Sequence, residues 1–349
     1  MEHLSAIAFT EQGCRLARRI ADTLLAQRVV SHAAVAGPER FAEACGVDAY
    51  DSLSEWTKRA FGESDVLLFV SATGIAVRAV APYVADKFAD PAVVSIDELG
   101  QFTVPLLSGH VGGANSFARM LEHVVGATAV ISTATDVNGL FAVDEWACMH
   151  NMVICERDIA KDVSSALLAG EPVGFASDFP VTGSLPGGVV DASSGGADCK
   201  IGFCVTLDEG RRPFKRTLHL VPRIVTVGAG CRRDLAARFL ECCILEALDE
   251  VHVSPSAVRL LTSIDVKRDE RAFHVLAEER GWPLKFYTAD ELNAVPGEFA
   301  SSEFVHATVG TDNVCERAAV AEGAALLAGK RASEGATAAV ACDEFVVEF

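Results

Sequence analysis

The amino-acid sequence predicts an α/β protein: N-terminal and C-terminal α/β domains with mostly parallel sheets, joined by a small α/β middle domain. Short apolar, β-branched runs alternate with helical patterns, which is typical of a sheet covered by helices. The chain has 349 residues, and 50% of them are hydrophobic, so two or three cores can form. A stretch rich in glycine, serine, proline and aspartate interrupts the alternation between residues 177 and 197.

The first domain, residues 1–147, repeats a unit made of an apolar run, a short loop and a helical pattern. The runs on either side of the turn Asp97–Gly100 are expected to pair as strands. The expected strands are Leu4–Phe9, Val66–Val70, Pro91–Ile96, Phe102–Leu107 and Ala129–Ile131. The expected helices are two that end near Leu25 and Val84, then Phe117–Val125 and Phe141–His150.

The middle domain, residues 148–215, and the C-terminal domain, residues 216–349, are predicted from the same alternation. A connector is expected near residues 208–216. In the middle domain we expect the helix Ile159–Ala169 and the strands Pro172–Ala176 and Lys200–Thr206, followed by the run Arg216–Val221. In the last domain we expect the strands Arg223–Val227, Leu260–Ile264, Leu284–Tyr287, Phe304–Val309 and the β-type run Thr337–Val347, with the helices Cys231–Glu250, Arg271–Arg280 and one that ends near Leu327.

Composition excludes several classes of function. The net charge of −18 argues against a nucleic-acid partner, because phosphate backbones bind to basic surfaces. The sequence shows neither a signal peptide nor an apolar run of membrane-spanning length, so we expect no membrane partner and a cytoplasmic location. The 11 cysteines form no CxxC pair, and they are expected to be reduced thiols rather than metal ligands. P-loop, GxSxG and HExxH motifs are absent.

The loop Ser108–Asn115 is the most informative segment. It follows a β-type run and precedes an amphipathic helix, and its glycines would let a ligand approach the backbone N–H groups at the helix start. His110, whose side chain ordinarily titrates near neutrality, lies in the middle of it. The loop therefore predicts binding of an anionic group beside a proton carrier. The alternative is that the glycines only permit a tight turn.

Four polar loops follow predicted strand ends: Thr10–Gly13, Ser71–Gly74, Ser108–Asn115 and Ser132–Asp136. The carboxyl ends of parallel strands gather at one edge, where ligands of open α/β folds bind, so we expect the four loops to share an edge. Helix capping by their serine, threonine and aspartate side chains is the alternative explanation.

A second glycine loop is expected in the last domain at Val227–Gly230, between a strand and a helix. Arg232 and Arg233 would occupy the first turn of that helix, where positive charge opposes the helix dipole. This unfavourable placement raises the expectation of an anionic ligand nearby.

Several of these segments together resemble one family, the cobalt-precorrin-5A hydrolases of the oxygen-independent branch of cobalamin synthesis. The similar segments follow one another in order across nearly the whole chain. They are Phe69–Arg78, Ser108–Asn115, Thr133–Asp136, Ser177–Pro180, Val227–Arg233, Ser263–Glu270, Val309–Gly310 and Val314–Glu316.

The resemblance implies hydrolytic opening of the δ-lactone of cobalt-precorrin-5A, with release of acetaldehyde, to give cobalt-precorrin-5B. Cobalt arrives inside the substrate, so no cofactor and no protein metal site are implied. The implied partner is the cobalt-corrinoid substrate, and neighbouring enzymes of the pathway could make transient contact. The alternative is a non-catalytic corrinoid-binding or handover protein of the same pathway, in which the loops hold carboxylates and nothing titrates.

Roles for individual residues follow from the chemistry of the step. Lactone hydrolysis needs a base and donors for an oxyanion, which we expect to be His110 and the amides of Gly112 and Gly113, with Asp136 orienting His110 or a water molecule. Loop residues and local cations are expected to bind the substrate carboxylates. They are Thr73, Gly74, Arg78, Ser108, Gly109, Gly112, Gly113, Asn115, Thr133, Thr135, Gly228, Gly230, Arg232 and Lys267.

Overall fold

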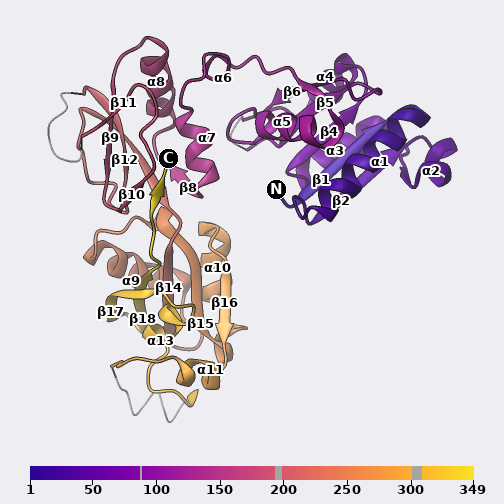
Figure 1. Ribbon diagram of the computed structural model, residues 1–349. Helices are drawn as coiled ribbons and strands as arrows, with labels where there is room; N and C mark the ends of the chain where they lie inside the picture. The colour runs from indigo at the N-terminus through magenta and orange to yellow at the C-terminus, as the bar shows by residue number, and fades with distance from the viewer. Residues whose placement is uncertain (87–88, 193–198, 301–308) are drawn as a thin grey trace. The chain divides into compact units, whose positions relative to one another are not determined.

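The computed structural model describes residues 1–86, 89–192, 199–300 and 309–349 (Figure 1). These residues form two compact units, Met1–Glu145 (the N-terminal unit) and Trp146–Phe349 (the C-terminal unit). Helices alternate with strands in both, and the larger sheets are mostly parallel, so the predicted α/β fold class is confirmed. The three-domain boundaries stay a prediction.

The N-terminal unit is a seven-stranded sheet with strand order β3-β2-β1-β4-β5-β6-β7. Its central strands are fully buried, because helices cover both faces of the sheet (Figure 1). The strands are β1 (His3–Ala8), β2 (His32–Gly37), β3 (Asp48–Ala49), β4 (Val66–Val70), β5 (Ala92–Ile96), β6 (Phe102–Leu107) and β7 (Thr128–Ala129). The helices are α1 (Glu11–Ala26), α2 (Glu39–Cys45), α3 (Leu53–Glu63), α4 (Thr73–Val80), α5 (Ala114–Val125), α6 (Ala134–Val137) and α7 (Val143–Met149), which continues into the C-terminal unit.

One hairpin determines at which edge of the sheet the loops after its strands lie. Strand β6 pairs antiparallel with β5, whereas the other strand pairs of the sheet are parallel. The connecting turn is fixed by Asp97, whose carboxylate accepts hydrogen bonds from the amides of Leu99 at 2.9 Å and Gln101 at 3.0 Å. Gly100 provides the left-handed backbone that the turn requires, with φ of +72°.

The reversal places the four polar loops at two edges of the sheet, so the prediction of one shared edge is wrong. The loops Thr10–Gly13 and Ser71–Gly74 follow β1 and β4 at one edge. The loops Ser108–Asn115 and Ser132–Asp136 follow β6 and β7, which run in the other direction, and lie at the opposite edge. There, Ser108 Oγ donates a hydrogen bond to the carbonyl of Asp90, just before β5, at 2.8 Å.

The C-terminal unit begins with a five-stranded sheet of order β11-β9-β12-β13-β8. Its strands are β8 (Met152–Ile154), β9 (Val173–Ser177), β11 (Val189–Asp191), β12 (Ile201–Val205) and β13 (Arg216–Pro222), and α8 (Arg157–Leu168) packs on it. Strand β13 lies beyond the predicted boundary after residue 215, and it pairs with β12 and β8 in this sheet. The short strands β10 (Val181–Thr182) and β19 (Val347–Glu348) pair with each other.

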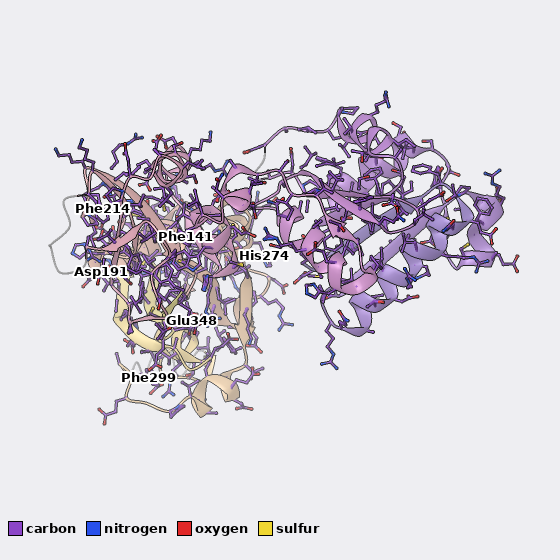
Figure 2. The ribbon with its side chains drawn as sticks, turned by 45° about the horizontal axis from the view of Figure 1, so that its top comes forward. Phe141, Asp191, Phe214, His274, Phe299 and Glu348 are labelled. Atoms are coloured by element: carbon purple, nitrogen blue, oxygen red, sulfur yellow. The ribbon has the colours of Figure 1, made fainter. Side chains whose placement is uncertain are left out.

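Aromatic side chains pack on both faces of this sheet. Trp146 stacks on Phe349 with ring centroids 4.7 Å apart, and its indole N–H donates to the carbonyl of Glu348 at 2.9 Å. Phe214, labelled with Glu348 in Figure 2, lies across Gly174 and Gly202 on neighbouring strands. A Cβ at either glycine would come within 2.5 Å of this ring, so glycine is required at both positions.

A second five-stranded sheet, of order β16-β15-β14-β18-β17, completes the C-terminal unit. Its first three strands are parallel, and β18 and β17 are antiparallel additions. The strands are β14 (Val225–Cys231), β15 (Val258–Ile264), β16 (Leu284–Tyr287), β17 (Ala325–Ser333) and β18 (Ala336–Cys342). The helical elements are α9 (Ala237–Glu250), η1 (Pro255–Ala257), η2 (Asp265–Lys267), α10 (Arg271–Arg280), α11 (Ala289–Ala294) and α13 (Cys315–Val320).

This sheet corrects three predictions. Strand β14 continues through Cys231, so Gly228 and Gly230 lie in a strand rather than in a loop. Helix α9 begins at Ala237, so Arg232 and Arg233 are not in its first turn. The segment expected to be the end of a helix near Leu327 is part of β17, because its residues pair with β18. Residues 304–308 of the predicted strand Phe304–Val309 lie outside the described residues.

Candidate active site and C-terminal pocket

The loop between β6 and α5 folds tightly back on the start of α5. Ser108 has a left-handed backbone with φ of +54°, and Gly113, the residue before α5, has φ of +82°. A Cβ at Gly112 would lie 2.3 Å from the Cβ of Ser108, and one at Gly109 would lie 2.9 Å from the side-chain oxygen of Asn115. Close packing and a left-handed residue therefore explain all three glycines.

The loop also uses most of the amides that we expected to face a ligand. Gly113 donates to the carbonyl of His110 at 2.9 Å, Ala114 to that of Ser108 at 3.1 Å, and Asn115 to that of Gly109 at 2.9 Å. The amide of Gly113 is therefore already bonded within the loop, and an oxyanion contact from it stays a prediction that requires this bond to open. The amide of Gly112 donates to none of the residues in the described ranges.

His110 lies between two carboxylates. Its Nε2 atom is 3.1 Å from Asp136 Oδ2, and its Nδ1 atom is 3.4 Å from Asp144 Oδ2. Thr135 Oγ1 also lies 3.2 Å from Nε2. The imidazole is 16% exposed, so it is largely withdrawn from water but still reachable from the surface. The predicted pairing of His110 with Asp136 is present in the structure.

The Asp136 carboxylate is held on both oxygens. Asn115 Nδ2 donates to Oδ2 at 2.9 Å and to Thr133 Oγ1 at 3.0 Å. Arg119, one turn further along α5, donates to Oδ1 at 2.8 Å. Because Asp136 is bonded to a cation and to amide and imidazole groups, it is fixed in position as a hydrogen-bond acceptor.

The two carboxylates change the protonation state of His110. The hydrogen bond and charge of Asp144, followed by those of Asp136, raise the pKa of His110 to about 9 against an opposing effect of burial. The expectation that this side chain titrates near neutrality is therefore wrong, and the imidazole is protonated at pH 7. In this state His110 can donate a proton, but it cannot accept one.

Two members of this cluster, Asp144 and Arg119, were missed in the sequence. Asp144 matches the acidic residues that favour any helix start, and only its position opposite His110 reveals a further role. The spacing of Arg119, four residues after Asn115, places both on one helix face and could have identified it. Arg119 and Asp136 also line a cavity of about 200 Å³ with Glu122, Ala129, Ile131 and Val137.

Three predicted substrate-binding residues do not belong to this cluster. Thr73 and Gly74 begin α4, after β4, at the edge of the sheet away from the β6 loop. Arg78 turns back on its own helix, where its guanidinium donates to the carbonyl of Gly74 at 3.1 Å. The antiparallel strand β6 accounts for this separation.

The second sheet of the C-terminal unit carries a larger cavity, of about 680 Å³, which we call the C-terminal pocket. It brings together Gly230, Arg232 and Lys267, three of the predicted substrate-binding residues. Its other lining residues are Cys231, Arg233, Ile264, Val266, Glu270, Val309, Val314, Cys315, Lys330, Gly335 and Thr337.

Gly228, by contrast, is buried away from the C-terminal pocket. A Cβ there would lie 1.9 Å from the carbonyl oxygen of Cys315 and 2.6 Å from the amide of Ala319, both in α13. This glycine lets α13 pack against β14 and does not line the pocket, so its packing role explains it, and a substrate contact at Gly228 stays a prediction.

No cluster of three or more histidine, cysteine, aspartate or glutamate side chains suited to a metal ion occurs among the described residues. Burial raises the pKa of the pocket thiol Cys231 to about 11, so this thiol is neutral near pH 7. Within the described ranges, no helix is long and apolar enough to cross a membrane.

Comparison with known proteins decides the family. Residues 55–136 match the family model described as "Cobalamin synthesis G N-terminal", and residues 225–341 match "Cobalamin synthesis G C-terminus". The chain is 34% identical over 330 residues to the cobalt-precorrin-5A hydrolase of Salmonella typhimurium, which covers 91% of each chain. The chain belongs to the cobalt-precorrin-5A hydrolase family.

Family membership places the protein in cobalamin biosynthesis and confirms the resemblance in the sequence. The cobalt-precorrin-5A hydrolase of Priestia megaterium is 29% identical over 272 residues, 73% of this chain and 71% of its own length. The crystal structure of a cobalamin biosynthesis protein G homologue from Sulfolobus solfataricus aligns over 98% of this chain and 97% of its own, at 21% identity and a TM-score of 0.43.

Proposed function

We propose that the protein opens the δ-lactone of cobalt-precorrin-5A by hydrolysis and releases acetaldehyde, giving cobalt-precorrin-5B. The observation that carries this proposal is the protonated imidazole of His110, held between Asp136 and Asp144. The Salmonella relative is named for the same substrate. Cobalt enters as part of the substrate, so the chemistry required of the protein is proton transfer and positioning.

The first step is the addition of water to the lactone carbonyl carbon, with one proton of that water passing to solvent, followed by cleavage of the ring C–O bond. The departing oxygen needs a proton, and His110 is charged and able to supply it. Its Nδ1 atom is the donor we propose, because the 3.4 Å contact to Asp144 is the longer of its two carboxylate contacts. A substrate oxygen can replace that contact more easily than the one to Asp136.

The second step is the release of the two-carbon fragment. The carbinol formed in the first step loses its O–H proton to the now neutral His110, and the carbon–carbon bond to the macrocycle breaks. Acetaldehyde departs, and the electron pair left on the macrocycle carbon takes up a proton from solvent, which balances the proton released by the attacking water. His110 thus acts as an acid and then as a base, and it ends in its starting state. One water is consumed for each acetaldehyde released.

Arg119 and the amide of Gly112 are proposed to bind the substrate beside His110. Arg119 borders the 200 Å³ cavity, a size that suits one carboxylate arm of the substrate rather than the whole macrocycle. The Arg119 side chain is 48% exposed, so it can bind such an arm while keeping its contact with Asp136.

Replacing His110 tests the proposal. His110→Asn keeps an N–H donor but cannot carry a proton, and it should lower acetaldehyde release from cobalt-precorrin-5A by about 10²–10⁴-fold. His123→Asn, on the exposed side of α5, is the matched control and should retain full activity. In the wild-type protein the rate should fall as pH rises through about 9, because the acid form of His110 is lost.

Two results would contradict the proposal. Near-normal turnover in a stably folded His110→Asn variant would remove His110 from the chemistry. Corrinoid binding by the wild-type protein without any acetaldehyde release would favour the non-catalytic corrinoid-binding or handover alternative.

A further inference from the structure

The C-terminal pocket has a composition that its packing does not explain. Four cations line it, Arg232, Arg233, Lys267 and Lys330, against one carboxylate, Glu270. The whole chain carries 48 acidic and 30 basic residues, so acidic side chains that could pair with these cations are abundant in the sequence. Among the described residues, however, Lys267 has a carboxylate partner, Glu270 at 3.4 Å, and the other three cations have none.

The position of Arg232 is fixed by the hairpin between β17 and β18. Its amide donates to the carbonyl of Gly335 at 2.9 Å, and its side chain lies over the same residue. A Cβ at Gly335 would come within 3.1 Å of Arg232 Cδ, and Gly335 also has φ of +86°. The turn therefore fixes the backbone of Arg232 and packs against the inner part of its side chain, while the residue stays exposed and open to a ligand.

Lys267 and Lys330 reach the pocket from two other segments, η2 and β17. Glu270 binds Lys267 and also accepts a hydrogen bond from the amide of Asp234 at 2.9 Å. The backbone of Lys330 donates to the buried carboxylate of Glu316 at 2.6 Å, which fixes the strand from which this lysine projects. The cations thus project from separate, anchored segments.

The rest of the pocket is apolar. Ile264, Val309 and Val314 contribute hydrocarbon surface, and Val266 is 62% exposed beside Lys267. A small anion such as phosphate would leave this surface uncovered. A ligand with an apolar body and several carboxylates would cover it and satisfy the cations at the same time.

We infer that the C-terminal pocket binds the carboxylate-bearing edge of a corrinoid macrocycle, and that it does so without the participation of His110. The identity of the macrocycle rests on the proposed function. The charge and the apolar surface of the pocket define the ligand class, an apolar ring with carboxylate arms.

Two corrinoids that differ in their side-chain charge provide matched probes. Cobyrinic acid carries carboxylates around a corrin ring, and in dicyanocobinamide amides replace them. Binding to the full-length protein is measured by calorimetry. We expect cobyrinic acid to bind at least tenfold more tightly than dicyanocobinamide, and its affinity to fall as salt concentration rises, because the contacts are ionic.

Arg232→Gln and Lys330→Gln should each weaken cobyrinic acid binding by roughly tenfold, the effect of losing one charge-assisted hydrogen bond. Arg331→Gln is the matched control, since Arg331 neighbours Lys330 but pairs with Glu246 and Glu250 outside the pocket. It should bind as the wild-type protein does. Circular dichroism confirms that each variant is folded.

The inference is overturned if the Arg232 and Lys330 variants bind like the wild-type protein, or if Arg331→Gln weakens binding equally. It is also overturned if both corrinoids bind with equal affinity. His110→Asn separates the two proposals, because it should lose acetaldehyde release and keep cobyrinic acid binding. If the Arg232 and Lys330 variants bind cobyrinic acid normally and release acetaldehyde normally, this inference alone is refuted. If the wild-type protein binds cobyrinic acid in a charge-dependent way but releases no acetaldehyde, the proposed function alone is refuted.

Discussion

The charge state of His110 depends most on Asp144, and replacing that residue gives a direct test. The pKa of His110 is raised from 6.5 to about 9, with Asp144 as the largest cause. At about 1.4 kcal/mol per pH unit, the net effect of the two carboxylates and the opposing burial favours the protonated imidazole by about 3 kcal/mol. Asp144→Asn removes one charge and leaves Asp136, so it should lower the pKa of His110 by about one to two pH units.

The same change should alter how stability depends on pH. Because the pKa of His110 is higher in the folded than in the unfolded protein, its contribution is complete below about pH 6.5. It is lost as the pH rises through about 9. In Asp144→Asn, the loss of unfolding free energy between pH 6 and pH 10 should be smaller by about 1–3 kcal/mol.

NMR titration of the His110 ring protons measures the pKa, and urea unfolding at pH 6 and pH 10 measures the stability. Glu145→Gln is the control, because Glu145 contacts Ser116 rather than His110. An unchanged pKa in Asp144→Asn, or a wild-type pKa near 6.5, would refute the reasoning.

Two further predictions concern the core of the protein. Gly228→Ala should destabilise the C-terminal unit by about 3 kcal/mol or more in urea unfolding, because the new methyl group would overlap the backbone of α13. Gly62→Ala is the control, since it has open space around it and should be neutral or stabilising by up to about 1 kcal/mol. Trp146→Ala should lower the free energy of unfolding by about 3–5 kcal/mol, since it removes the stack on Phe349 and the hydrogen bond to Glu348. A decrease below about 1 kcal/mol would show that this ring is not part of the core.

Local patterns in the sequence were sufficient for many elements. Strands β4, β5 and β6 and helix α5 lie close to where apolar runs and helical periodicity predict them, because burial on one or both faces imposes those patterns directly. The segment between residues 28 and 65 shows the limit. It contains β2, β3, α2 and α3, of which the two strands and α2 are short and partly exposed and therefore carry a weak pattern. Helix α3 begins after the capping residue Ser52 and buries Trp56 and Ala60 on one face, so its pattern could have identified it.

The sequence by itself determined the family and the α/β class, and it offered a contact between His110 and Asp136 as one of two roles for Asp136. Only the tertiary structure decided which loops share an edge, because the direction of a strand in a sheet depends on its neighbours, and the Asp97–Gly100 hairpin reverses β6. It also decided that Gly228 is a packing residue and that Asp144 faces His110. A pKa follows from charges that folding brings together, so the acid form of His110 could not be read from the loop that contains it.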